Sequence, residues 1–154
     1  EQALADTGIN PALLELEITE SMAMLEPDYV IGVIHKVKTL GISVAVDDFG
    51  TGFSSLSYLQ RLAVDRLKID RGFVNAIRSP AHTTECIAQT VIQLGRNLGL
   101  TVIAEGVETE TQARLLKQMG CHEAQGYLFA HPLDSSELVR WLEQHRDSGC
   151  PLND

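Results

Sequence analysis

The sequence predicts an α/β fold, the C-terminal part of a TIM-type (β/α)8 barrel with about five β/α units. Strand-like and helix-like segments alternate along the chain with short connections, which is typical of a parallel sheet covered by helices. Each predicted strand also has one aliphatic face and one polar face. A complete barrel needs roughly 250 residues, whereas this chain has 154.

The polar strand face decides between two architectures, an open doubly wound sheet and a barrel. In the first strand, Glu15 and Glu17 share one face, while Leu14 and Leu16 share the other. An open sheet that is covered on both faces has nearly continuous hydrophobic strands. A polar inner face that ends in charged residues is typical of the mouth of a barrel, where barrel enzymes have their active sites. We therefore favour the barrel.

The chain is predicted to begin with a helix around residues 2–4. A strand follows at residues 13–18, where charged and aliphatic side chains alternate. Residues 27–40 are predicted to be helical, because their apolar side chains recur at helical spacing and Gly41 provides a stop signal.

The central part of the chain contains two further predicted strands, each followed by a short helical turn. β-branched residues predict a strand at 42–47, and a helical turn at 54–61 follows a glycine-rich segment. Alternating residues predict a strand at 66–70, with a helical turn at 72–77 after it.

The remaining strands, at residues 100–105 and 122–128, alternate with helices. Apolar residues at helical spacing predict a helix at residues 83–98. The helix at residues 109–119 begins with a Thr-x-x-Gln capping box at Thr109.

A last helix is predicted at residues 134–145, which begin with Asp-Ser-Ser-Glu. We expect Leu138, Trp141 and Leu142 to be buried, with Trp141 fixing this helix against the barrel. Residues 1–147 are assigned to one partial domain and residues 148–154 to a frayed C-terminal tail.

Composition excludes several functions. The net charge of −9 argues against a general nucleic-acid-binding surface, so DNA is not an expected partner. Three separated cysteines, Cys86, Cys121 and Cys150, indicate reduced thiols and a cytoplasmic location. No apolar run is long enough to span a membrane. The chain begins with Glu1, so we expect it to be part of a longer protein, which other domains could attach to a membrane.

Polar residues collect at the predicted strand ends. This set comprises Glu17, Asp47, Asp48, Lys68, Asp70, Glu105, Glu108 and Gln125. Hard divalent cations such as Mg²⁺ and Mn²⁺ choose oxygen ligands of this kind. Two such ions can stabilise the attacking and leaving oxygens of a phosphoryl displacement. The set therefore predicts a metal site at the mouth of the barrel.

Lys68 is the cation among these carboxylates, and we expect it to remain protonated. It could orient an attacking water or stabilise charge in the transition state. It could also form an internal salt bridge with Asp70 or Glu105, and the two roles are compatible.

Five segments closely resemble the EAL domain family of cyclic di-GMP phosphodiesterases. They are LELEITES at 14–21, DDFGTG at 47–52, LKID at 67–70, AEGVET at 104–109 and QGYLF at 125–129. They occur in the family's order and spacing, and together they cover nearly the whole chain. The resemblance implies a bacterial second-messenger hydrolase that converts cyclic di-GMP to linear 5′-pGpG with two Mg²⁺ or Mn²⁺ ions.

The resemblance also implies roles for single residues. Glu17 resembles a ligand of the first metal, Asp47 the carboxylate shared by both metals, and Asp48 a ligand of the second. Lys68 is similar to the lysine that holds the nucleophilic water. Glu105 is similar to the glutamate that acts as general base or belongs to the metal–water network.

Four further positions resemble supporting residues of the family. Gln125 matches a glutamine that orients water and ligands. Glu20 matches the residue that holds the loop following Asp48, and Glu108 and Asp70 match residues that support the site. The resemblance further implies a homodimer formed through residues 47–56, and GGDEF or sensor domains elsewhere in the protein.

Two departures from the family pattern qualify these expectations. The Glu-Ala-Leu signature and the asparagine-bearing strand are absent, and Gln2-Ala3-Leu4 is not that signature. The sequence also has Ala-His-Pro at 130–132, where Ser-Lys-Pro or Ser-Arg-Pro is usual. His131 is therefore either a neutral surface substitution or a ligand contact.

We expect these 154 residues alone to show little turnover, weakened metal binding and self-association. The alternative function is a catalytically silent EAL domain that binds cyclic di-GMP or a partner protein.

Overall fold

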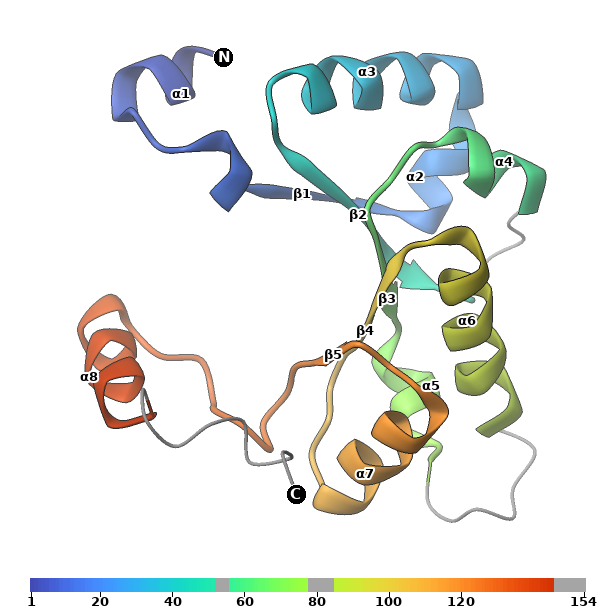
Figure 1. The fold of residues 1–154 in the computed structure, drawn as a ribbon, viewed down its shortest axis with the longest axis vertical. Coiled ribbons are helices and arrows are strands. Elements are labelled where there is room, and N and C mark those ends of the chain that lie inside the picture. The colour runs from blue at the N-terminus through green and yellow to red at the C-terminus, as the bar shows by residue number, and fades with distance from the viewer. Residues whose placement is uncertain (52–55, 78–84, 146–154) are drawn as a thin grey trace.

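Five parallel β-strands form the centre of the structure, a computed structural model that describes residues 1–51, 56–77 and 85–145 (Figure 1). The strands are β1 (Glu15–Thr19), β2 (Ser43–Phe49), β3 (Arg66–Ile69), β4 (Thr101–Ala104) and β5 (Glu123–Ala124). They pair in chain order, and every pairing is parallel. A doubly wound sheet reverses its strand order at a switch point, and the order observed here shows no such reversal.

Helices follow the strands and gather mainly on one side of the sheet (Figure 1). They are α1 (Gln2–Thr7), α2 (Glu20–Leu25), α3 (Pro27–Thr39), α4 (Leu56–Arg61), α5 (Arg71–Asn75), α6 (Glu85–Leu98), α7 (Glu110–Met119) and α8 (Ser135–His145). Right-handed crossovers between strands in chain order place their helices on the same face. In Figure 1, α2, α4, α6 and α7 lie on one side, whereas α1 and α8 lie on the other. The predicted partial barrel is confirmed.

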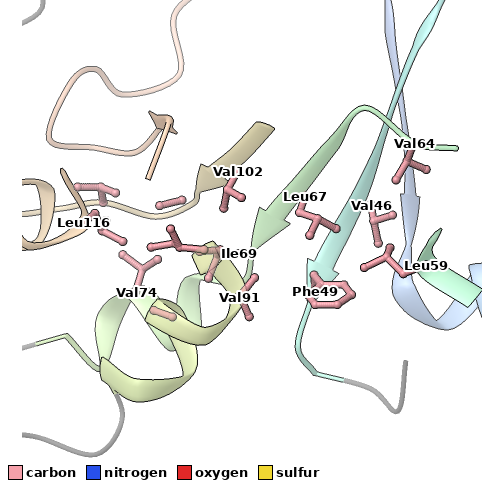
Figure 2. Close-up of a cluster of buried hydrophobic side chains, with 14 of the residues drawn as sticks. Val46, Phe49, Leu59, Val64, Leu67, Ile69, Val74, Val91, Val102 and Leu116 are labelled. Atoms are coloured by element: carbon pink, nitrogen blue, oxygen red, sulfur yellow. The ribbon is translucent and has the colours of Figure 1, made fainter. Parts of the chain in front are cut away.

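The hydrophobic core fills the space between the sheet and the helices (Figure 2). Alternate strand residues supply one half of this core, namely Val44, Val46, Leu67, Ile69, Val102 and Ala104. Helix residues that include Leu59, Val74, Val91 and Leu116 supply the other half. The alternate residues of β2, β3 and β4 that were predicted to be aliphatic therefore face the helices. The polar residues between them lie on the opposite face of the sheet.

Side-chain caps begin several of the described helices, including α7 and α2. At α7, Thr109 Oγ1 accepts a hydrogen bond from the Gln112 N–H, and Gln112 Oε1 accepts one from the Thr109 N–H, as the predicted capping box requires. Helix α2 lies outside the predicted elements. It begins where Thr19 Oγ1 accepts from the Met22 N–H at 3.3 Å, so the first strand leads directly into a helical turn.

The first and last strands are shorter than predicted. A 3-10 turn at Pro11–Leu13, capped by Asn10, occupies the start of the predicted first strand. The last strand was predicted at residues 122–128 but spans only Glu123–Ala124. The chain turns at Gly126, where a Cβ atom would lie 2.2 Å from the Val107 carbonyl oxygen. This close approach requires glycine and ends the strand pairing.

Helix α8 forms as predicted, but its apolar face is not buried. Leu138 is 46% exposed and Leu142 is 53% exposed, so the expected packing of this face is wrong. Trp141 stacks on His145 of the same helix, with ring centroids 4.2 Å apart. Figure 1 shows α8 standing apart from the sheet. Residues 146–154, which include the predicted tail, lie outside the described part of the chain.

No helix among the described residues combines the length and the apolar character needed to cross a bilayer.

Asp65 connects three strands just before β3. Its Oδ2 accepts a hydrogen bond from the Val44 N–H at 2.9 Å, and its carboxylate pairs with Lys38. Its main-chain N–H donates a hydrogen bond to the Val44 carbonyl on β2, and its carbonyl accepts one from the Thr101 N–H on β4. Burial opposes ionisation, but the bonds to Lys38 and Val44 hold the pKa of Asp65 below its usual range. The ionised side chain therefore stabilises the β2–β3 junction.

We expect Asp65→Ala to lower the free energy of unfolding by about 1–2 kcal/mol at pH 7, because the Val44 N–H loses its acceptor. The folded pKa lies below the unfolded one, so this contribution is present above the unfolded value, about 4, and is lost as pH falls through the folded value. Urea unfolding at pH 7 and pH 3 measures it. Asp28→Ala, which removes an exposed ion pair with Arg61, is the control and should cost under about 0.5 kcal/mol. Equal costs for the two variants would contradict this account.

Candidate functional site

Lys68 lies at the centre of the polar sheet face. Its side chain is 6% exposed, and Nζ lies 2.6 Å from Glu105 Oε1, 2.7 Å from Glu17 Oε1 and 3.3 Å from Asp47 Oδ1. Burial alone lowers the pKa of an amine, but hydrogen bonds to Glu105 and Glu17 outweigh it and raise the pKa of Lys68. The side chain is therefore an ammonium at neutral pH. The predicted salt bridge with Glu105 is present.

A β-bulge brings two adjacent carboxylates to the same place. Neighbouring side chains of a regular strand point to opposite faces, but the β2–β3 register shifts between Val46 and Phe49. Asp48 adopts a left-handed backbone with φ of 52°, a conformation that aspartate tolerates better than most residues. Carboxylate oxygens of Asp47, Asp48 and Glu105 consequently lie within 4.8 Å of one another.

This three-carboxylate group carries more negative charge than its surroundings neutralise. Burial, together with the charges of Asp47 and Asp70, raises the pKa of Asp48. Burial also raises the pKa of Glu105, although the Lys68 ammonium opposes that shift. A shared cation relieves such repulsion, and an oxygen-only donor set suits a hard divalent ion. The residues present therefore fit a hard divalent cation.

Gln125 orients the carboxylate of Glu105. Its Nε2 donates a hydrogen bond to Glu105 Oε1 at 2.8 Å, and its main-chain N–H donates to the Ala104 carbonyl at 2.9 Å. The oxygen that contacts Lys68 is also Oε1. One oxygen of Glu105 thus receives two hydrogen bonds, which leaves Oε2 as the freer acceptor.

Glu20 supports the turn that follows the acidic pair. Its carboxylate is buried, and Oε2 accepts a hydrogen bond from the Gly50 N–H at 2.9 Å. Gly50 has a φ of 100°, and a Cβ there would lie 2.9 Å from the Phe73 ring. The turn therefore needs both a glycine and a buried acceptor. Residues 52–55 of the predicted dimer segment lie outside the described part of the chain.

The other predicted site residues lie around this centre. Glu17 reaches Lys68 but does not belong to the three-carboxylate group, and its side chain is 46% exposed. Asp70 caps α5 by accepting from the Gly72 N–H at 2.8 Å. The exposed Glu108 is held through its main chain, whose N–H donates to Gln112 Oε1 at 2.9 Å. His131 is exposed, and its ring lies 4.3 Å from that of Tyr127.

Two supporting residues are absent from the sequence-based set. Gln112 is buried, and besides its two main-chain donors it contacts the Val74 carbonyl through Nε2 at 3.3 Å. The capping-box pattern in the sequence predicted that Gln112 helps to begin α7. It did not predict that Gln112 also binds the main chain of Glu108. Tyr58 donates to the Ala23 carbonyl at 2.6 Å and so connects α4 to α2. Nothing in the local sequence pattern of Tyr58 indicates this long-range contact.

The arrangement suits the activation of water beside an anionic substrate. Asp47, Asp48 and Glu105 could hold a divalent cation, which would lower the pKa of a bound water and neutralise phosphate charge. The Lys68 ammonium lies beside the same carboxylates. A half-buried carboxylate with a raised pKa, Glu105, is available to accept a proton. Hydrolysis of a phosphate ester is the chemistry that these groups fit best.

Comparisons with known proteins agree on one family. The EAL domain family matches residues 1–132. The cyclic di-GMP phosphodiesterase NbdA of Pseudomonas aeruginosa is 42% identical over 149 residues, which cover 97% of this chain and 19% of that protein. The bifunctional diguanylate cyclase/cyclic di-GMP phosphodiesterase MucR of the same organism is 42% identical over 139 residues, 89% of this chain and 20% of that protein.

Solved structures show the same similarity. The MucR phosphodiesterase in complex with cyclic di-GMP superposes with a TM-score of 0.84 at 42% identity, over 89% of this chain and 55% of that chain. Klebsiella pneumoniae BlrP1, solved with manganese and cyclic di-GMP, gives a TM-score of 0.77 at 34% identity, over 85% of this chain and 33% of that chain. The chain thus spans about half of the MucR structure and about a fifth of the curated relatives.

Proposed function

The chain belongs to the EAL domain family, and on this premise we propose that the complete domain hydrolyses cyclic di-GMP to linear 5′-pGpG with Mg²⁺ or Mn²⁺. The observation that carries the proposal is the convergence of Asp47, Asp48 and Glu105 beside the Lys68 ammonium. NbdA and MucR are named as cyclic di-GMP phosphodiesterases, and the BlrP1 structure contains manganese together with cyclic di-GMP.

The chain's own residues have separable roles in this reaction. Asp47, Asp48 and Glu17 are proposed as metal ligands, and ions bound there would supply an acidified water and neutralise phosphate charge. Lys68 donates a hydrogen bond that orients the attacking water and stabilises the charge that develops on the phosphoryl oxygens. Glu105 accepts the proton of that water through the oxygen that Lys68 and Gln125 leave free.

The supporting residues keep these groups in place. Glu20 holds the turn after Asp48 through Gly50. Asp70 fixes the start of α5. Glu108 is proposed to support the segment after β4, where Gln112 holds its main chain. Proper alignment of reacting groups accounts for a large part of the rate of such reactions, so these residues act on turnover without touching the substrate.

We further propose the molecular setting that the resemblance implies. The protein works in the cytoplasm, forms a homodimer through residues 47–56, and carries GGDEF or sensor domains outside this chain. The bifunctional name of MucR supports the pairing with a diguanylate cyclase domain.

The decisive experiment measures cyclic di-GMP hydrolysis by the complete protein with Mn²⁺, with Mg²⁺ and after chelation, using chromatography to detect 5′-pGpG. We expect metal-dependent formation of the linear product. Metal-dependent binding of cyclic di-GMP without turnover would instead support the silent receptor, and turnover that survives chelation would contradict the metal assignment.

A second arm assays residues 1–154 alone. We expect little or no turnover and self-association in gel filtration, because α8 leaves apolar side chains exposed and the inner sheet face is not covered by helices. A monomer of this chain that hydrolyses cyclic di-GMP at the rate of the complete protein would contradict this expectation.

A further inference from the structure

Arg66 joins three strands on the polar face of the sheet. Its Nε lies 3.1 Å from Glu15 Oε2 on β1, and its Nη1 lies 2.9 Å from Glu123 Oε2 on β5. Different nitrogens of one planar guanidinium therefore reach the two outer strands from the central strand β3. Neither β2 nor β4 contributes a charged partner to this ionic bridge, which we call the Arg66 bridge.

The Arg66 bridge has the composition of one layer in a barrel interior, where alternate strands contribute the side chains of each layer. Glu15, Arg66 and Glu123 come from β1, β3 and β5. The next layer toward the site comes from the even strands and contains the buried residues Ala45 and Ile103, which are 0% and 6% exposed. A layer of buried side chains thus separates the bridge from the site.

The third layer again comes from the odd strands, and it contains the proposed site. Glu17 on β1 and Lys68 on β3 each follow a member of the Arg66 bridge by two residues, so they share its face at about 6.6 Å further along the strand direction. Gln125, the first residue after β5, follows Glu123 by two residues and reaches the same site through its hydrogen bond to Glu105. Lys68 bonds Glu17 directly and reaches Gln125 through Glu105. The spacing of β1, β3 and β5 at the bridge therefore sets the spacing of these three side chains.

We propose that Arg66 is a positioning residue, which through Glu15 and Glu123 fixes the separation of β1, β3 and β5. Glu17 and Lys68 lie on the first two of these strands, and Gln125 directly follows the third. The proposal deepens the proposed function and rests on it. A partly exposed ion pair adds little to folding stability, and the Arg66 side chain is 34% exposed. The bridge therefore matters more for geometry than for folding.

The test compares Arg66→Met, Arg66→Lys and a matched control, Lys38→Met, in the complete protein. Lys38 also pairs with a carboxylate and is also 34% exposed, but it lies outside the polar sheet face. Mn²⁺ binding without substrate is measured by electron paramagnetic resonance, and kcat, KM and thermal unfolding are measured beside it.

We expect Arg66→Met to weaken Mn²⁺ binding on the order of 10-fold, the low end for loss of a residue that orients metal ligands, and to lower kcat. Arg66→Lys should recover only part of this loss, because one ammonium cannot replace two separated guanidinium nitrogens. Lys38→Met should bind Mn²⁺ as the wild type does.

Unchanged Mn²⁺ affinity in Arg66→Met, or an equal loss in Lys38→Met, would overturn the positioning role. Full recovery in Arg66→Lys would overturn it too, since charge alone would then suffice. A wild-type protein that binds Mn²⁺ without hydrolysing cyclic di-GMP overturns the proposed function only, because the Mn²⁺ comparison between variants still decides the role of Arg66. A wild type that binds no Mn²⁺ overturns both.

Discussion

Asp47→Ala is expected to abolish cyclic di-GMP hydrolysis by the complete protein, with a loss of at least about 1,000-fold in kcat/KM. This loss corresponds to about 4 kcal/mol of transition-state stabilisation, a reasonable share for a ligand placed between two ions. Asp47 and Asp48 both belong to the three-carboxylate group. Of these two, Asp47 is the one with an ion pair to Lys68. A water molecule would not supply the negative charge that Asp47 contributes to the proposed metal site.

Two measurements make the Asp47 result specific. Mn²⁺ binding should weaken together with turnover, whereas thermal unfolding should change little, because Asp47 removal relieves repulsion with Asp48 and Glu105. Asp28→Ala, on the exposed start of α3, is the control and should keep wild-type hydrolysis. Wild-type turnover by Asp47→Ala protein would show that the two-metal assignment is wrong.

The periodicity of the sequence predicted much of this fold, because strands impose a period of two. Alternation along β2, β3 and β4 correctly placed Val46, Leu67 and Val102 against the helices. By the same rule, Glu17 and Lys68 belong to the opposite face, and the structure brings them to 2.7 Å. Arg66 lies on that face too, so parity alone could have identified it as a partner of Glu15 and Glu123.

Features that depend on distant contacts could not be predicted in this way. Strict alternation places Asp48 opposite Asp47, and only the bulge and the left-handed φ of Asp48 bring the carboxylates together. The fifth strand ends early because Gly126 approaches the main chain of Val107. The apolar stripe of α8 predicted a buried face, but periodicity does not show which surface, if any, covers Leu138.

Lys68→Met is expected to cost about 3 kcal/mol of folding stability at pH 7, because breaking a buried ion pair leaves its charged partners uncompensated. Glu105 and Asp47 would then lie close together without a cation, and Glu17 would lose its partner. The wild-type contribution is fully present at neutral pH. The folded pKa of Lys68 is raised, so its stabilisation persists below the unfolded value of about 10.4 and fades only at more alkaline pH.

The pH dependence of the variant should have the opposite sign to ordinary acid denaturation. Without Lys68, the folded pKa of Glu105, already raised by burial, rises further above its unfolded value of about 4.3. Such a group destabilises the fold while it is ionised, and the penalty disappears as pH falls through the folded pKa. The stability that Lys68→Met protein loses relative to wild type should therefore be smaller at pH 5 than at pH 7.

Urea unfolding at the two pH values, with and without Mn²⁺, measures this effect in the complete protein. Mn²⁺ should restore part of the stability lost at pH 7, since a divalent ion replaces the missing positive charge among Asp47, Asp48 and Glu105. Hydrolysis should stay low even at saturating Mn²⁺, because no donor then orients the water. Lys38→Met, whose pair lies away from the site, should gain nothing from Mn²⁺ beyond the wild-type response. A Lys68→Met protein whose stability relative to wild type does not depend on pH or Mn²⁺ would show that Lys68 neutralises no carboxylate cluster.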